Sequence, residues 1–263
     1  MKYNWDWTVI LCTSDDEAEQ ASWLWFLARD EVCQNPYLEW ILMGFGWTIA
    51  VALCAWVITF ILGSIVGIAR TMEDHKVVYA IATIYVEVFR NIPLLVQMFL
   101  WFFVFPEILP ESAGNWLKRG MPLPEFWTAV VCLGMYQASR TAEQVRAGIQ
   151  SIPPGQTAAG LALGLTMFQV YRGILLPVSY RIIIPPLTSD FMGIFKNSSV
   201  ALVIGVMELT AQARQVSEYS YAVFEAFTAA TFLYILVTFV VVTTMTYVEK
   251  KVHIPGAISL EKK

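Results

Sequence analysis

The sequence predicts an all-α integral membrane protein with five transmembrane helices, its N-terminus outside and its C-terminus inside. The composition is the first observation: 57% of the 263 residues are hydrophobic and 14% are charged, whereas about 25% of the residues of an average soluble domain are charged. The second is a set of five apolar stretches, each near or above the ~20 residues that a helix needs to cross a bilayer. The third is the uneven distribution of lysine and arginine between the connecting segments.

Residues 1–36 are expected to form a segment on or near the outer membrane face. Four tryptophans in it are typical of side chains at a membrane–water interface: Trp5, Trp7, Trp23 and Trp25. The segment does not read as a signal peptide, because it is acidic and lacks a basic start followed by a short apolar core. Cys12 and Cys33 could form a disulfide in an oxidising compartment, and free thiols fit the sequence equally well.

The predicted permeation domain covers residues 37–249. Its five spans run over approximately residues 37–69, 77–105, 126–149, 184–206 and 223–248. Pro93 interrupts the second span, because it removes a backbone donor and leaves carbonyls without a partner. Ten of the 17 lysines and arginines then lie on the inner side, five on the outer side, and Arg90 and Lys196 within spans. This asymmetry orients the N-terminus outside and makes residues 250–263 a cytoplasmic tail.

Small residues predict two helix-packing features. Gly63 and Gly67, four residues apart in the first span, are typical of a face on which two helices approach closely. Between the third and fourth spans, a small-residue segment predicts a compact cytoplasmic helix that begins near Pro154, with alanine and glycine giving another protein close access to its backbone. Its candidate contact residues are Gly155, Gln156, Ala158, Ala159, Gly160, Leu163, Gly164 and Leu165. By itself, this segment could equally be an ordinary loop.

Arg90 and Lys196 are the first candidates for a substrate pathway. Both fall near mid-membrane, where a charge costs about 2.5–3.5 kcal/mol on insertion scales and usually faces a cavity or a partner. A guanidinium grips a carboxylate with two donors, and an ammonium supplies a point charge. Neighbouring polar residues could complete such a site: Glu87, Asn91, Gln97, Asn197 and Ser198. Alternatively, Glu87 and Arg90 pair along their helix, and Lys196 contacts a partner subunit.

Two further sets of charges have simple interpretations. Glu143 and Arg146 lie three residues apart near the inner end of the third span, which favours an internal ion pair over a gate that opens during transport. Glutamates of the outer segments could dock a partner protein or form a solvated rim: Glu107, Glu111, Glu125, Glu208 and Glu218.

The sequence contains no motif for catalysis or metal binding. It has no Gly-x-x-x-x-Gly-Lys loop, no His-Glu-x-x-His and no Cys-x-x-Cys. His75 and His253 lack the spacing of metal ligands. The chain is therefore not expected to be an enzyme or to hold a cofactor, and a nucleotide that drives it would bind another subunit.

The coupling segment, about residues 150–172, resembles the coupling loop of membrane subunits of ATP-binding cassette importers. That motif reads Glu-Ala-Ala, three residues, Gly and a later Leu-Pro. Here Ala158-Ala159-Gly160 occupies the place of Glu-Ala-Ala, Gly164 is the spaced glycine and Leu176-Pro177 ends the pattern. Residues 85–97, 144–151 and 195–199 are similar to signatures of polar amino acid permeases. The likeness is closest to the glutamate/aspartate import permeases and covers roughly the whole chain.

The resemblance implies a permease subunit in a bacterial inner membrane that carries L-glutamate and L-aspartate by alternating access. It also implies a second permease subunit, two ATPase subunits that hold ATP and Mg, and a periplasmic binding protein. A heterodimer of permeases is favoured over a homodimer, because Ala158 replaces the motif's glutamate and one of two paired subunits can depart from the motif. Two alternatives stay open: a permease for glutamine, histidine or arginine, and an ATP-independent secondary transporter.

Overall fold

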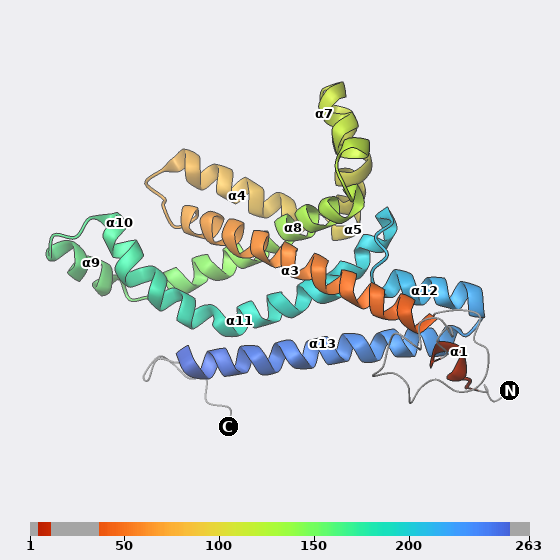
Figure 1. The fold of residues 1–263 in the computed structure, drawn as a ribbon. Helices are drawn as coiled ribbons and strands as arrows, with labels where there is room; N and C mark the ends of the chain where they lie inside the picture. The colour runs from red at the N-terminus through yellow and green to blue at the C-terminus, as the bar shows by residue number, and fades with distance from the viewer. Residues whose placement is uncertain (1–4, 12–36, 253–263) are drawn as a thin grey trace. The chain divides into compact units, whose positions relative to one another are not determined.

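The structure, a computed structural model, describes residues 5–11 and 37–252, and all regular secondary structure in that part of the chain is helical (Figure 1). The predicted all-α class is confirmed for these residues. Cys12, Cys33, most of the predicted outer segment and the tail beyond residue 252 lie outside the described residues.

The chain divides into two compact units. Among the described residues, the first contains 5–11, 37–53, 98–130 and 195–238, and the second contains 54–97, 131–194 and 239–252. Three long helices have substantial parts in both units: α3 (Tyr37–Ala69), α8 (Pro124–Gln150) and α13 (Val223–Val252).

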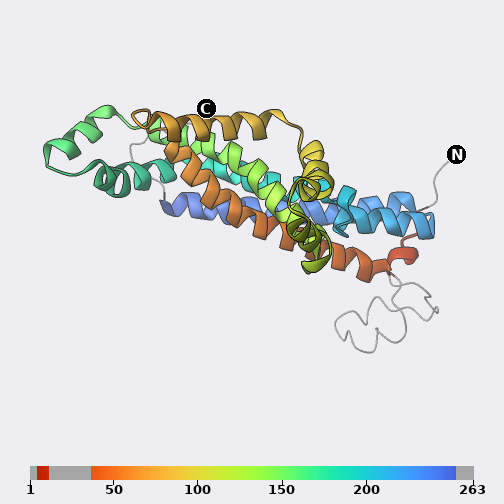
Figure 2. The same cartoon turned by 90° about the horizontal axis from the view of Figure 1, so that it is seen from above.

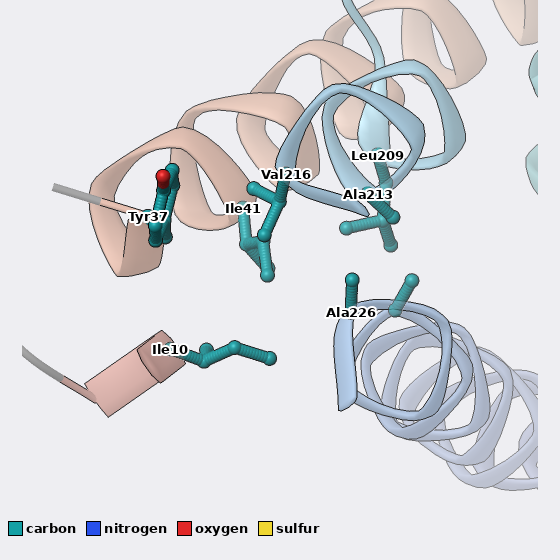
Figure 3. Packing of buried hydrophobic residues seen from close by; sticks show 8 residues of the cluster. Ile10, Tyr37, Ile41, Leu209, Ala213, Val216 and Ala226 are labelled. Atoms are coloured by element: carbon teal, nitrogen blue, oxygen red, sulfur yellow. The ribbon is translucent and has the colours of Figure 1, made fainter. Parts of the chain in front are cut away.

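The core of the first unit gathers side chains from four helices. They are α1 (Thr8–Leu11), the start of α3, α12 (Leu209–Ser220) and the start of α13. Figure 3 shows Ile10, Ile41 and Val216 converging on this core, and all three are buried. The unit also contains the short helices α6 (Phe105–Ile108) and α7 (Glu111–Asn115).

Glu208 corrects one sequence expectation. It was expected at an outer rim, but its side chain is fully buried. Its carboxylate accepts hydrogen bonds from the backbone N–H groups of Thr210 (3.0 Å) and Ala211 (2.8 Å) and from the hydroxyl of Tyr234 (2.9 Å). The first turn of α12 has N–H groups without helical partners, and Glu208 satisfies two of them as an N-cap. It is therefore a structural residue and not part of a docking surface.

The second unit is built around the second half of α3. α4 (Lys76–Asn91) folds back beside it, as Figure 1 shows, and Val66, Ala82, Val86 and Ala142 form a buried cluster there. The remaining helices of this unit are α9 (Pro154–Ala162), α10 (Met167–Val170) and α11 (Leu176–Asn197), and α5 (Leu94–Phe99) begins in it. A π-helical turn, Tyr171–Leu175, joins α10 to α11.

The predicted packing face at Gly63 and Gly67 is confirmed. A β-carbon on Gly63 would lie 2.9 Å from the Cβ of Thr141, and one on Gly67 would lie 2.7 Å from the carbonyl oxygen of Ala142. The backbones of α3 and α8 thus approach too closely in the second unit for any side chain larger than glycine.

Among the described residues, α3 and α13 are long and apolar enough to cross a membrane. The number rises to four if each of two bent helix pairs counts as one span. One of these pairs is α4 with the helices after it, broken at Ile92–Pro93 as the proline predicts. α8, the predicted third span, has 27 residues but is not in this set. It carries four charges: Glu125, Arg140, Glu143 and Arg146.

Candidate functional site

The most concentrated charge in the second unit is a group of three arginines around Glu143. Arg70, just after α3, donates from Nη1 to Oε1 of Glu143. Arg90, near the end of α4, places its Nη1 3.3 Å from the same oxygen, and Arg146 lies 3.9 Å from Oε2. Three positive charges therefore face one negative charge, and the cluster keeps an excess of two positive charges.

Burial distinguishes these arginines. The side chain of Arg70 is 5% exposed, whereas that of Arg90 is 47% exposed. A buried guanidinium needs a counter-charge, since removing water from an ion costs on the order of several kcal/mol. Arg70 thus depends on Glu143, while the exposed Arg90 has donor capacity left for an anion. The expected pair of Glu143 with Arg146 is present as one arm of a larger cluster.

The residues predicted around Arg90 are positioned by the break in the helix. Pro93 cannot donate to the carbonyl of Phe89, and the side-chain amide of Gln97 does so instead at 2.8 Å, with a second bond of 2.8 Å to the carbonyl of Ile92. Both amide hydrogens of Gln97 therefore stabilise the break. Asn91 donates to Glu87 at 3.1 Å, so the alternative Glu87–Arg90 pair gives way to two other pairs.

Lys196 and the residues predicted around it belong to the first unit, whereas Arg90 and the residues predicted around it belong to the second. Lys196 is exposed, Asn197 is half-buried and Ser198 is fully buried. The hydroxyl of Ser198 donates to the carbonyl of Phe195 at 2.7 Å, where α11 passes into a 3₁₀ helix, Ser198–Ile204. Of the three, Lys196 offers the charged and accessible group.

The coupling segment forms two short helices with a tight turn between them. α9 ends at a Schellman turn, in which Leu165 N–H donates to the Gly160 carbonyl (3.1 Å) and Gly164 N–H to the Leu161 carbonyl (3.0 Å). Gly164 has a φ of +82°, a left-handed conformation that favours glycine. Thr166 and Gln169 then form a capping box at the start of α10. Local sequence signals thus define this helix–turn–helix (Figure 2).

The predicted contact residues of the coupling segment fall into two groups. Gly160 is buried, and a β-carbon there would lie 3.0 Å from Val170 Cγ2, so its small size serves packing between α9 and α10. Leu165 is half-buried. The other predicted residues are exposed: Gly155, Gln156, Ala158, Ala159, Leu163 and Gly164. Leu163 (83% exposed) and Phe168 (72% exposed) make this surface apolar.

The segment is connected to the arginine cluster through the turn between α3 and α4. The hydroxyls of Thr71 and Tyr171 lie 2.9 Å apart, and Thr71 follows Arg70 in the chain. Val170 and Leu175 are buried with Val145 and Ile149 of α8 in one apolar cluster. α10 and the turn after it are therefore packed against the helix that carries Glu143.

A second polar group lies between α8 and α11, and the sequence pattern does not predict it. Asp190 of α11 is 8% exposed and accepts a hydrogen bond from Thr141 Oγ1 at 3.2 Å. Gln137 and Gln144 lie near it, and their side chains act on its carboxyl group. The three α8 residues are spaced by four and three positions, which places them on one helix face. That spacing is the available signal, but nothing local to Asp190 links it to α8.

The comparisons with known proteins agree with this architecture. The family model described as binding-protein-dependent transport system inner membrane component matches residues 59–254. The glutamate/aspartate import permease protein GltJ of Escherichia coli (strain K12) is 46% identical over 238 residues, 89% of this chain and 96% of that protein. The glutamate/aspartate import permease protein GltK of Escherichia coli O6:H1 is 30% identical over 217 residues, 82% and 95% of the two chains.

A solved structure has the same fold. The crystal structure of an amino acid ABC transporter with histidines matches with a TM-score of 0.69 and 27% identity, covering 82% of this chain and 95% of that one.

Proposed function

The chain belongs to the inner membrane components of binding-protein-dependent transport systems, and from this premise we propose that it carries L-glutamate and L-aspartate across the bacterial inner membrane. This choice of substrate is supported by the likeness to the Escherichia coli glutamate/aspartate import permease over most of both chains. A permease for glutamine, histidine or arginine is the second candidate. Family membership leaves no support for an ATP-independent secondary transporter.

The proposed topology has five spans with the N-terminus outside. They are α3, the broken pair that begins with α4, α8, α11 and α13. Two of the four charges of α8 are compatible with a membrane position, because Glu143 and Arg146 pair with each other within the second unit. In this topology residues 1–36 lie outside, residues 37–249 form the permeation domain, and the coupling segment and residues 250–263 lie in the cytoplasm.

The proposed assembly contains a second permease subunit, two ATPase subunits and a periplasmic binding protein. ATP and Mg would bind the ATPase subunits, so this chain would need no cofactor of its own. A heterodimer of permeases is favoured, because Ala158 replaces the glutamate of the coupling motif. Both E. coli relatives described above are named for glutamate/aspartate import, which supports two different permeases acting on one substrate class.

The substrate can be tested with the complete transporter reconstituted in lipid. With the binding protein present, we expect L-glutamate and L-aspartate to raise the ATP hydrolysis rate severalfold, and glutamine and histidine to leave it at the basal rate. Stimulation by glutamine or histidine alone would transfer the proposal to the second candidate. Amino acid uptake with no ATPase subunit present would overturn the whole assignment.

Leu163→Asp tests the coupling surface. Leu163 is 83% exposed, so the change should not disturb folding, but it places a charge in an apolar contact. We expect the ATPase subunits to be retained about tenfold less well or worse, since a hot-spot truncation costs about 2 kcal/mol or more. The measurement is co-purification of ATPase subunits in detergent. Tyr221→Asn, at a residue that is 87% exposed in the first unit, is the control and should retain them normally. Equal retention in both variants would contradict a contact at Leu163.

A further inference from the structure

Tyr171 makes a hydrogen bond whose direction is fixed by its surroundings. The hydroxyl of Thr71 donates to the carbonyl of Ile68 at 2.7 Å. A hydroxyl carries one O–H donor, so Thr71 can only accept in its 2.9 Å contact with the hydroxyl of Tyr171. Tyr171 therefore donates to Thr71, and Thr71 in turn donates to the backbone of α3. The bond joins the coupling segment to the end of a helix 100 residues earlier in the chain.

Tyr171 lies between the exposed and the buried parts of the coupling segment. Phe168, one helical turn before it, is 72% exposed and belongs to the apolar surface described above. Val170 is buried, and the ring of Tyr171 packs against the cluster that contains Val145 of α8. Tyr171 also begins the π-helical turn that joins α10 to α11, and such turns are frequent at functional sites. The hydroxyl that bonds to α3 is therefore one turn away from the exposed surface.

The other end of this bond is next to the buried ion pair. Thr71 follows Arg70, which is 5% exposed and donates to Glu143. The N–H of Thr71 also donates to the Ile68 carbonyl, at 2.9 Å, so two bonds hold Thr71 to the last turn of α3. Figures 1 and 2 both show this turn at the same end of the second unit as α9 and α10. The bond from Tyr171 thus ends on the backbone that positions Arg70.

A second tyrosine makes the same kind of bond outside the coupling segment. The hydroxyl of Tyr180, in α11, donates to Oγ of Ser64, and Ser64 donates to the carbonyl of Phe60 at 2.6 Å. Tyr171 and Tyr180 are both half-buried, and both are linked through a hydroxyl to a backbone carbonyl of α3. Tyr180 is therefore a matched control for the chemistry of the bond.

We propose that Tyr171 is a positioning residue for the coupling of ATP hydrolysis to transport, and that it acts through its hydrogen bond to Thr71. This inference rests on the proposed function, in which ATPase subunits bind the coupling segment. When these subunits move the segment, the bond carries the movement to the end of α3 and to Arg70. The exposed surface binds the ATPase without the half-buried hydroxyl of Tyr171, so binding and coupling can be measured separately.

The test uses the complete transporter in lipid with its binding protein. It measures basal ATP hydrolysis, hydrolysis stimulated by L-glutamate, and L-glutamate taken up per ATP hydrolysed. For Tyr171→Phe, which keeps the ring in place, we expect stimulation and uptake per ATP to fall about threefold or more, the scale of one lost neutral hydrogen bond. Tyr180→Phe should leave both quantities unchanged. In detergent, both variants should retain the ATPase subunits as the parent does.

Thr71 gives a second arm of the experiment. Thr71→Val removes the acceptor with little change in volume and should reproduce the effect of Tyr171→Phe. Thr71→Ser keeps the hydroxyl and should couple as the parent does. The double variant with Tyr171→Phe and Thr71→Val should be no worse than either single variant, because both changes remove one shared interaction.

Three results would overturn the role of Tyr171. The first is coupling in Tyr171→Phe that equals coupling in Tyr180→Phe. The second is a double variant in which the two losses add, since independent residues behave in this way. The third is loss of the ATPase subunits from Tyr171→Phe, which would show that the hydroxyl only maintains the shape of the coupling segment.

The proposed function can fail separately from the role of Tyr171. If glutamine stimulates the parent transporter in place of L-glutamate, the proposed substrate is wrong, and the same variants compared with glutamine decide the role of Tyr171. A parent whose ATP hydrolysis responds to no amino acid would overturn the proposed function and this inference with it. A parent that responds to L-glutamate, matched by Tyr171→Phe, would overturn this inference alone.

Discussion

Glu143→Gln is expected to destabilise the protein by about 3 kcal/mol, because it leaves the guanidinium of Arg70 buried without a counter-charge. Arg70 is 5% exposed, and Glu143 is 29% exposed and neutralises it. Removing one partner of a fully buried pair costs about 3–5 kcal/mol, and the partial exposure of Glu143 places the expected cost at the lower end. The measurement is thermal unfolding in detergent, followed by tryptophan fluorescence of the purified chain with its partner subunits.

Two variants make this expectation specific to the buried pair. Glu218→Gln removes a carboxylate that lies 2.8 Å from Arg214, but these side chains are 58% and 62% exposed. An exposed pair of this kind contributes about 0–1 kcal/mol, so this variant should unfold almost as the parent does. Replacing both Arg70 and Glu143 by methionine should restore most of the stability lost in Glu143→Gln, because this pair then leaves no unpaired charge. If Glu143→Gln and Glu218→Gln unfolded at the same temperature, Arg70 would not depend on Glu143 for its stability.

The parts of the fold that follow from local chemistry could be predicted from the sequence. Pro93 cannot donate a backbone hydrogen bond, and the second span breaks there. Proline at the start and glycine after the end bound α9 between Pro154 and Gly164. Gly63 and Gly67 mark the close contact with α8, because spacing by four residues puts both on one helix face.

The candidate site is formed by contacts between residues that are far apart in the chain, and local spacing does not predict such contacts. Glu87 and Arg90 are neighbours on one helix turn, yet Arg90 pairs with Glu143, 53 positions later in the chain. Gly160 looked like a contact for another protein, but Val170 and Ile174 pack against it. Asp190 is not predicted from its own neighbours in the chain, because its hydrogen-bond partner Thr141 is on α8, 49 positions earlier. Tertiary packing decides these cases.

Gly67→Leu is expected to have the second large effect, since α3 and α8 are in backbone contact at this position. A β-carbon on Gly67 would lie 2.7 Å from the Ala142 carbonyl oxygen and 2.7 Å from the Cβ of Val145. A backbone oxygen cannot rotate away as the end of a side chain can, so the helices must separate. Overpacking of a well-packed interior costs about 1–3 kcal/mol and occasionally more, and we expect the upper part of this range.

Gly46→Leu is the control, because Gly46 lies on the same helix with nothing within 4 Å of a β-carbon. It introduces the same side chain and the same gain in helix propensity, roughly 1 kcal/mol for replacing glycine. The temperature of thermal unfolding should therefore fall for Gly67→Leu and stay level or rise for Gly46→Leu. If the two variants unfolded alike, the close approach of α3 to α8 would not be a source of stability. A loss confined to Gly67→Leu would identify the contact at Ala142 as its cause, since helix propensity favours both substitutions.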